Sequence, residues 1–219
     1  MENIQAVLTG NTLQIQGFPD AIKVIQLSGH GARRLSHLML HLSDLEFAKK
    51  CLEEIDPNCE LISVVNEALW TAAIVRFIKC YCFSKSRFQL STGKTLRGTD
   101  PSFLVAYKYF YDLRSKHLVH DENAFSQGLP YALLNDGNKP YKIEKVVCAA
   151  HRAVTLEPGN LQNLKLLIEK SLNWVTSEAD MLFVSLGEGL EALPYKELYE
   201  RGGVRYVPPQ AKDMSGTRP

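Results

Sequence analysis

Residues Pro101–Asp121, PSFLVAYKYFYDLRSKHLVHD, combine a helix start, an apolar helical face and a polar end. Asp100 can cap the start of a helix, and proline is favoured at the first helical position. Apolar residues then recur at the three- and four-residue steps of a buried helical face, at Phe103, Ala106, Tyr107, Phe110 and Leu113. The stretch therefore predicts a helix over 101–117 that ends in a dense polar cluster.

The spacing of one arginine and one histidine in this polar cluster is informative. Five residues separate Arg114 from His120 in the tract YDLRSKHLVHD. This tract resembles the Arg-x(4–6)-His signature of the HEPN superfamily, small helical bundles that include many metal-independent ribonucleases. It looks closest to the branch linked to phage abortive infection, in which a similar Leu-Arg-x-Lys-x-x-x-His tract ends a helix.

The resemblance implies a fold, an assembly and a biological setting. The fold is an antiparallel four-helix bundle, and the assembly is a homodimer in which two Arg/His pairs face one cleft. The setting is phage defence or a toxin–antitoxin pair, with an antitoxin as partner protein and RNA as substrate. Many members of the superfamily have lost activity, so the alternative is a non-catalytic HEPN-like module for dimerisation or for binding a nucleotide or a partner.

The chemistry of metal-independent RNA cleavage fits these two residue types. A base must take the proton of the ribose 2′-OH, and an acid must protonate the leaving 5′-oxygen. Histidine suits both steps because its pKa lies near neutrality. Arginine suits the charged phosphorane because its planar fork binds phosphate oxygens in pairs. We therefore predict an endoribonuclease without a cofactor, with Arg114 and His120 as the catalytic residues.

Three neighbours of this pair are predicted to support it. Ser115 follows the arginine and is a candidate phosphate contact. Asp121 is placed to hold the ring of His120 in one tautomer. His117 lies three residues after Arg114 on the same helical face, which makes it the alternative histidine for the catalytic role.

Helix geometry sets a condition on the pair. A six-residue step on a straight α-helix turns through about 600°, or about 240° net, so Arg114 and His120 would not converge. The helix must therefore break near Leu118. The same side chains also have a purely structural interpretation, because cations at a helix C-terminus interact favourably with the helix dipole, by about 0.3–1 kcal/mol each.

Three further stretches predict long helices, near 32–55, 59–83 and 161–186. Each repeats apolar residues at three- and four-residue steps. The middle of the second, ALWTAAIV, is apolar nearly all round, which favours a central position. With 101–117, these stretches predict a mainly α protein built as an antiparallel four-helix bundle.

Strands are expected in two places. A short strand pair is predicted within 1–28, around the turn-forming Gly10-Asn11. A second hairpin is predicted within 127–148, with its turn at Asp136-Gly137-Asn138, and a short helix near 144–153 is the alternative.

These elements predict one domain and a tail. Residues 1–190 are expected to form a single HEPN-like helical domain, and the resemblance covers roughly 30–186 of it. Residues 191–219 are expected to form an extended or disordered C-terminal tail.

The bulk composition excludes some function classes. Of the 219 residues, 45% are hydrophobic and 22% charged, and the net charge of +1 gives no global basic field, so RNA contacts need a local patch. The segment Ser84–Thr99 carries four bases and no acid, and it is either such a patch or a solvated connector. The predicted RNA-binding residues are Lys85, Arg87, Lys94, Arg97 and Lys116.

Other motifs do not support a nucleotide, metal or membrane site. The GKT at 93–95 is not a P-loop, because position 88 is Phe where such a loop needs glycine. Five irregularly spaced cysteines predict reduced, mostly buried thiols in the cytoplasm, with no metal bound. His37 and His41 are interpreted as a packed or solvated pair. The sequence contains no apolar run long enough to span a bilayer, and no membrane partner is expected.

Overall fold

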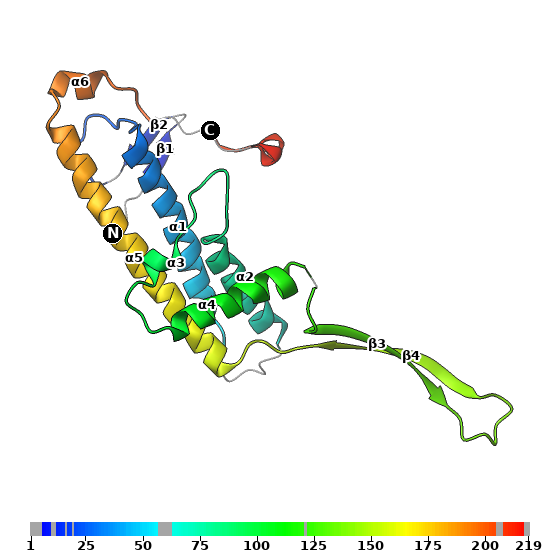
Figure 1. The fold of residues 1–219 in the computed structure, drawn as a ribbon. Coiled ribbons are helices and arrows are strands. Elements are labelled where there is room, and N and C mark those ends of the chain that lie inside the picture. The colour runs from blue at the N-terminus through cyan, green and yellow to red at the C-terminus, as the bar shows by residue number, and fades with distance from the viewer. Residues whose placement is uncertain are drawn as a thin grey trace. The chain divides into compact units, whose positions relative to one another are not determined.

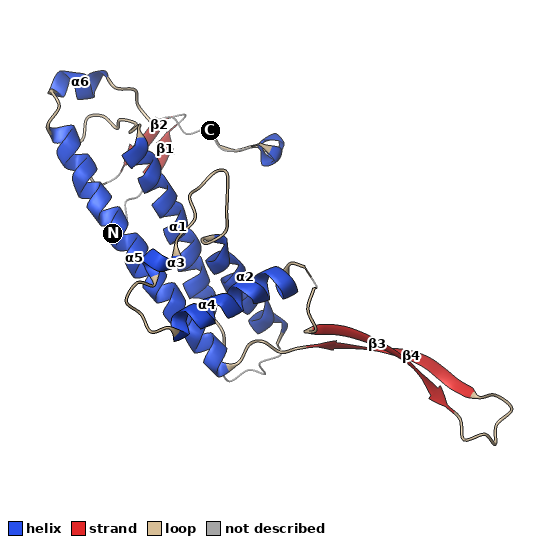
Figure 2. Cartoon of the chain, viewed as in Figure 1, coloured by secondary structure: helices blue, strands red, loops and turns tan. Residues whose placement is uncertain are grey.

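The computed structural model is mainly helical, with two separate antiparallel two-stranded sheets (Figures 1 and 2). It describes residues 6–9, 12–15, 17–18, 20–56, 63–120, 122–204 and 208–216. The chain divides into two compact units. Unit 1 consists of Met1–His41, Phe83–Phe88 and Val175–Pro219, and unit 2 of Leu42–Cys82 and Gln89–Trp174. No described helix is long and apolar enough to cross a membrane.

Four long helices account for most of the helical structure of the described chain. They are α1 (His30–Glu53), α2 (Val64–Lys79), α4 (Ser102–Leu113) and α5 (Pro158–Glu191). Each lies where the sequence predicts a long helix, so the mainly α fold class is confirmed, with shifted helix ends.

The shifted ends have local causes. The predicted start of α2 at 59–62 lies outside the described residues, and the described helix is capped by Ser63, whose hydroxyl accepts a hydrogen bond from the Asn66 N–H at 3.1 Å. The helix ends before the predicted residue 83 because the N–H groups of Cys80 and Tyr81 bond three residues back, which tightens the last turn. At the start of α4, Asp100 Oδ1 accepts the Ser102 N–H at 2.8 Å, as the predicted cap requires.

The core of unit 2 is built around aromatic rings on α2 and α4. Trp70, Phe77 and Phe110 are all at most 2% exposed. The rings of Trp70 and Phe110 meet edge to face, with centroids 5.8 Å apart. The indole N–H of Trp70 donates to Thr155 Oγ1 at 3.0 Å, which satisfies this buried donor.

A polar contact also lies inside this core. The hydroxyl of Tyr81 lies 2.6 Å from Ser171 Oγ on α5 and 3.0 Å from Thr95 Oγ1 in the short helix α3 (Thr92–Thr95). Burial raises the pKa of Tyr81 to about 12. The ring is therefore held neutral, and its hydroxyl joins α5 to the turn that contains the GKT sequence.

Removing this hydroxyl is expected to destabilise the fold. Tyr81→Phe should lower the free energy of unfolding by about 1–2 kcal/mol at pH 7. Between pH 10 and 12 the unfolded chain releases the Tyr81 proton while the folded chain keeps it, so wild-type stability should fall as the pH rises through this window. Urea titrations at pH 7 and pH 11 measure both effects. The exposed Tyr195→Phe is the control, and an equal pH dependence in the two variants would contradict the prediction.

Unit 1 contains the N-terminal strand pair. β1 (Ala6–Thr9) and β2 (Thr12–Ile15) are antiparallel, with Thr9 opposite Thr12, so the predicted strand pair is confirmed. Its predicted turn at Gly10-Asn11 lies outside the described residues. Elsewhere in unit 1, Arg34 on α1 forms an ion pair with Glu178 on α5 at 2.6 Å.

The second hairpin is longer than predicted. β3 (Ser126–Leu134) and β4 (Ile143–Arg152) pair antiparallel, with a register shift at Leu133/Leu134. The turn residues behave as the sequence predicts, because Gly137 has φ +90° and Asp136 Oδ1 accepts the Asn138 N–H at 3.0 Å. The alternative of a short helix near 144–153 is therefore wrong.

The C-terminal segment is not wholly extended. It contains α6 (Tyr195–Glu200) and a 3-10 turn over Ala211–Ser215. One i,i+4 ion pair within it joins Lys196 to Glu200 and another joins Glu197 to Arg201. Such pairs stabilise a short exposed helix that has no apolar period to reveal it in the sequence.

Candidate functional site

The predicted polar cluster lies on an irregular turn. α4 runs directly into a π-helical turn, Arg114–Leu118, closed by a hydrogen bond from the Val119 N–H to the Arg114 carbonyl at 3.1 Å. The buried residues Phe110 and Leu113 hold the preceding turn in the core. The helix therefore ends at Leu118, near the position at which the predicted pairing of Arg114 with His120 requires a break. Single π-helical turns are frequent at functional sites.

The side chains of this tract have different environments. Arg114 and His117 are half-buried, whereas His120 is exposed. The buried Nε of Arg114 and Nδ1 of His117 have no hydrogen-bond partner among the described residues. The ring of His117 packs edge to face on Phe125, with centroids 5.5 Å apart. Ser115 is half-buried, and the predicted role of Asp121 concerns a residue outside the described part of the chain.

A groove of about 860 Å³ lies beside the π-helical turn, entirely within unit 2. It is formed by α2, by the end of the π-helical turn and by the base of the β3–β4 hairpin, and we call it the hairpin-base groove. Its polar lining residues are Glu67, Thr71, His117, Ser126, Gln127, His151 and Arg152. Val119, the residue before His120, also lines it, so the tract reaches the edge of this groove.

The groove contains two imidazoles and an ion pair. His117 comes from the π-helical turn and His151 from β4. Arg152 Nη1 lies 3.3 Å from Glu67 Oε1, and both side chains are more than half exposed. The groove thus holds two imidazoles, one cation able to bind phosphate and one carboxylate.

His151 is the groove residue that sequence reasoning missed. It lies opposite Gln127 in the hairpin register and is exposed. The local sequence carries no sign of a shared site, because His151 and His117 line the same groove only through the folding of distant segments. A histidine on a strand among apolar residues is the one indication that the sequence offers.

The predicted RNA-binding residues are divided between the two units. Lys94 and Arg97 are exposed in unit 2, and Lys85 is exposed in unit 1. Arg87 is only 8% exposed, and this burial argues against a phosphate contact there. Lys116 is exposed and lies 3.6 Å from Asp112, one turn earlier on α4.

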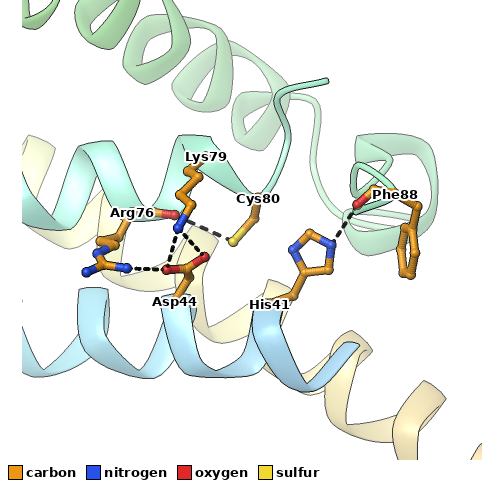
Figure 3. A network of polar contacts seen from close by, with 6 residues as sticks. All are labelled: His41, Asp44, Arg76, Lys79, Cys80 and Phe88. Atoms are coloured by element: carbon orange, nitrogen blue, oxygen red, sulfur yellow. Dashed lines mark hydrogen bonds and ion pairs between the residues drawn. The ribbon is translucent and has the colours of Figure 1, made fainter. Parts of the chain in front are cut away.

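Two other polar groups are structural (Figure 3). The buried carboxylate of Asp44 on α1 accepts hydrogen bonds from Arg76 at 2.6 Å and from Lys79 at 3.2 Å, both on α2. In unit 1, His41 Nε2 donates to the Phe88 carbonyl at 2.8 Å, and His37 Nδ1 accepts the Phe88 N–H at 3.3 Å.

These contacts agree with the packed interpretation of His37 and His41, because both rings hold the backbone of Phe88. Nowhere in the described ranges do three His, Cys, Asp or Glu side chains gather closely enough to hold a metal ion.

No family model, curated protein or solved structure matches the chain. The chemistry of the site is therefore inferred from its own side chains.

Proposed function

We propose that the protein is a metal-independent endoribonuclease of the HEPN type, a four-helix bundle in which Arg114 and His120 carry out the reaction. The observation that carries the proposal is the end of α4. The π-helical turn contains Arg114 and stops at Leu118, and His120 is exposed directly after Val119, a residue that lines the hairpin-base groove.

The proposed reaction is transesterification within the RNA strand. A histidine removes the proton of the 2′-OH, and the resulting oxygen attacks the adjacent phosphorus. The bond to the 5′-oxygen then breaks, and a second imidazole protonates that oxygen. The products carry a 2′,3′-cyclic phosphate and a 5′-hydroxyl.

Arg114 is proposed to stabilise the negative charge on the phosphorane. Its Nε has no hydrogen-bond partner among the described residues, and none of the ion pairs found in the described ranges includes its guanidinium. Within the described residues, the Arg114 guanidinium therefore forms no ion pair with a carboxylate. A preorganised cation in a site that is partly shielded from water stabilises the charge of the transition state more strongly than a cation in water does.

The second proton carrier has two candidate sources. The HEPN-like arrangement takes it from His120 of a second copy, which makes the active form a homodimer. The groove offers a source within one chain, because His117 and His151 both line it. We propose the dimeric arrangement, and the histidine variants described in the Discussion distinguish the two.

RNA is proposed to approach over the exposed cations of unit 2. Lys94, Arg97, Lys116 and Arg152 are all exposed. In this proposal the enzyme works in the cytoplasm, in phage defence or opposite an antitoxin that blocks the groove.

One observation favours the other candidate, a non-catalytic HEPN-like binding module. Glu67 lies in the groove and pairs with Arg152, so this cation is already partly neutralised. A carboxylate at this position repels a phosphate backbone and suits a peptide or another protein.

Purified protein is expected to cleave RNA in the presence of EDTA, because the nucleophile is the substrate's own 2′-OH and the proton transfers belong to histidine. Transfer, messenger and ribosomal RNAs form the test panel, each incubated with and without divalent metal. End analysis should find 2′,3′-cyclic phosphate on one product and 5′-hydroxyl on the other. A panel left intact under all conditions would favour the binding module instead.

A further inference from the structure

A second, smaller pocket adjoins the hairpin-base groove within unit 2, and we call it the Trp70 pocket. Its volume is about 130 Å³. The side chains that line both cavities include Glu67, Thr71, His117 and Arg152. Glu67 and Arg152 are more than half exposed, whereas Trp70 is only 2% exposed. The pocket therefore extends from the ion pair in the groove to the edge of the core.

The inner part of the Trp70 pocket is largely apolar. Leu118, Val154 and Leu156 line it together with Trp70. The indole N–H of Trp70 already donates to Thr155 Oγ1 at 3.0 Å, so the indole offers carbon surface to a ligand. Burying a charge without a partner is costly. The lining therefore suits an uncharged ring and disfavours a charged group such as a phosphate.

The volume of the pocket limits the size of that ring. An apolar protein cavity of about 150 Å³ holds one benzene molecule, and pockets for drug-sized ligands begin near about 300 Å³. A pocket of about 130 Å³ therefore has room for one six-membered ring. The second ring of a fused pair would have to lie outside it, in the groove.

The entrance of the pocket presents a hydrogen-bond acceptor next to a donor. Arg152 Nη1 donates to Glu67 Oε1 at 3.3 Å, a contact between one guanidinium nitrogen and one carboxylate oxygen. A guanidinium has five N–H donors, and a carboxylate accepts hydrogen bonds at about four lone-pair sites. The pair can therefore also bind a ligand edge on which a donor and an acceptor lie side by side.

We propose that the Trp70 pocket binds one pyrimidine base of an RNA strand in the hairpin-base groove. Glu67 accepts a hydrogen bond from the base, and Arg152 donates one to it. Cytosine places its N4 amino group beside the acceptor N3, and uracil places N3–H beside O4, so either base complements the pair. RNA as the strand in the groove comes from the proposed function, on which this site rests.

The pocket distinguishes bases by size as well as by hydrogen bonding. Adenine also has a donor and an acceptor side by side, at N6 and N1, but its second ring exceeds the volume of the pocket. Sequence-specific proteins commonly bind single-stranded RNA through bases that are turned out of the stack. His117 and Leu118 of the π-helical turn line the pocket, so a base bound there lies next to the tract that contains Arg114.

Binding of non-cleavable 2′-deoxy hexamers tests base recognition without cleavage. Trp174→Phe leaves Trp70 as the only tryptophan, so its fluorescence reports on the pocket. Hexamers of cytosine or of uracil should change this fluorescence and should bind at least about 5-fold more tightly than a hexamer of adenine, as expected for one good base contact. Preference for either pyrimidine supports the proposal.

Two variants remove the recognition in different ways. Glu67→Ala should weaken binding of the preferred pyrimidine hexamer by about 5- to 150-fold, the range for one good bidentate base contact. Val154→Phe should also weaken it, because Val154 lines the Trp70 pocket but not the hairpin-base groove. Glu144→Ala is the matched control, since Glu144 is also a half-exposed acid in an ion pair, with Lys139 at 2.8 Å. Circular dichroism verifies that each variant is folded.

Failure of the pocket can be separated from failure of the ribonuclease. Pyrimidine preference that Glu67→Ala abolishes, in a protein that leaves every RNA intact, would support the pocket and reject the enzyme. RNA cleavage together with equal affinity for the three hexamers would keep the enzyme and overturn the pocket.

Two further results would overturn the proposal. One is a pyrimidine preference that persists in both Glu67→Ala and Val154→Phe, which would place base recognition elsewhere. The other is the absence of binding by any hexamer, which would favour a protein side chain as the occupant of the pocket.

Discussion

Replacing His120 with alanine is expected to slow RNA cleavage by about 10²- to 10⁴-fold, the usual cost of losing a general acid–base histidine. The exposed imidazole lies beyond the end of the helix, so its removal takes away a proton carrier without opening the core. Single-turnover cleavage of an end-labelled RNA measures the rate. His30→Ala is the control, because His30 is an exposed histidine in unit 1, outside the tract.

Substitutions of Arg114 test the same site through the cleavage rate. Arg114→Ala should cost about 10²- to 10³-fold through lost stabilisation of the phosphorane. Arg114→Lys should recover little of this, because lysine keeps the charge but loses the two-pronged geometry. Full recovery by lysine would mean that Arg114 acts only as a general positive charge.

The histidines of the hairpin-base groove distinguish the two sources of the second proton carrier. If the dimer supplies two copies of His120, His117→Ala and His151→Ala should have mild effects. A full loss of cleavage in both of these variants, together with a mild effect of His120→Ala, would assign the reaction to the groove of a single chain. Binding of a non-cleavable 2′-deoxy substrate should remain intact in every purely catalytic variant.

Local sequence patterns predict local structure well in this protein. The apolar periods place all four long helices, and the turn chemistry at Asp136-Gly137 places the second hairpin. The helix also ends at Leu118, near the position at which the predicted pairing of Arg114 with His120 requires a break. Each of these features depends on residues that are close together in the chain.

The hairpin-base groove depends on residues far apart in the chain, which explains why the sequence does not predict it. Glu67, His117 and His151 come from α2, the π-helical turn and β4. Their proximity depends on how the hairpin base packs against the helices, and no local period encodes that. The π-helical turn was equally hidden, because its residues also fit a continuing α-helix.

Composition misleads in the basic segment Ser84–Thr99 for a related reason. Four bases without an acid predict a solvated patch, but composition carries no information about burial. Arg87 is buried, and the next residue, Phe88, is held by hydrogen bonds to two histidines of α1. Lys85 belongs to unit 1 with Arg87, whereas Lys94 and Arg97 belong to unit 2.

The second large effect is expected for stability, from a substitution in the core next to the site. Phe110→Ala is expected to lower the free energy of unfolding by about 3–5 kcal/mol, because it removes a fully buried ring and leaves a cavity against Trp70. This is a large part of a typical stability of about 5–15 kcal/mol. The melting temperature should fall by roughly 6–20 °C for a chain of this length.

Phe110→Ala should also disturb the proposed active site, because Phe110 lies one turn before Arg114. Trp70 would lose its edge-to-face neighbour, and its hydrogen bond to Thr155 anchors the chain that leaves β4. Cleavage well below the melting temperature should therefore fall further than the folded fraction does. Tyr111→Ala is the matched control, since this neighbouring ring is 41% exposed and its removal should cost about 1 kcal/mol or less. Equal melting temperatures for the two variants would mean that Phe110 does not hold the end of α4 in place.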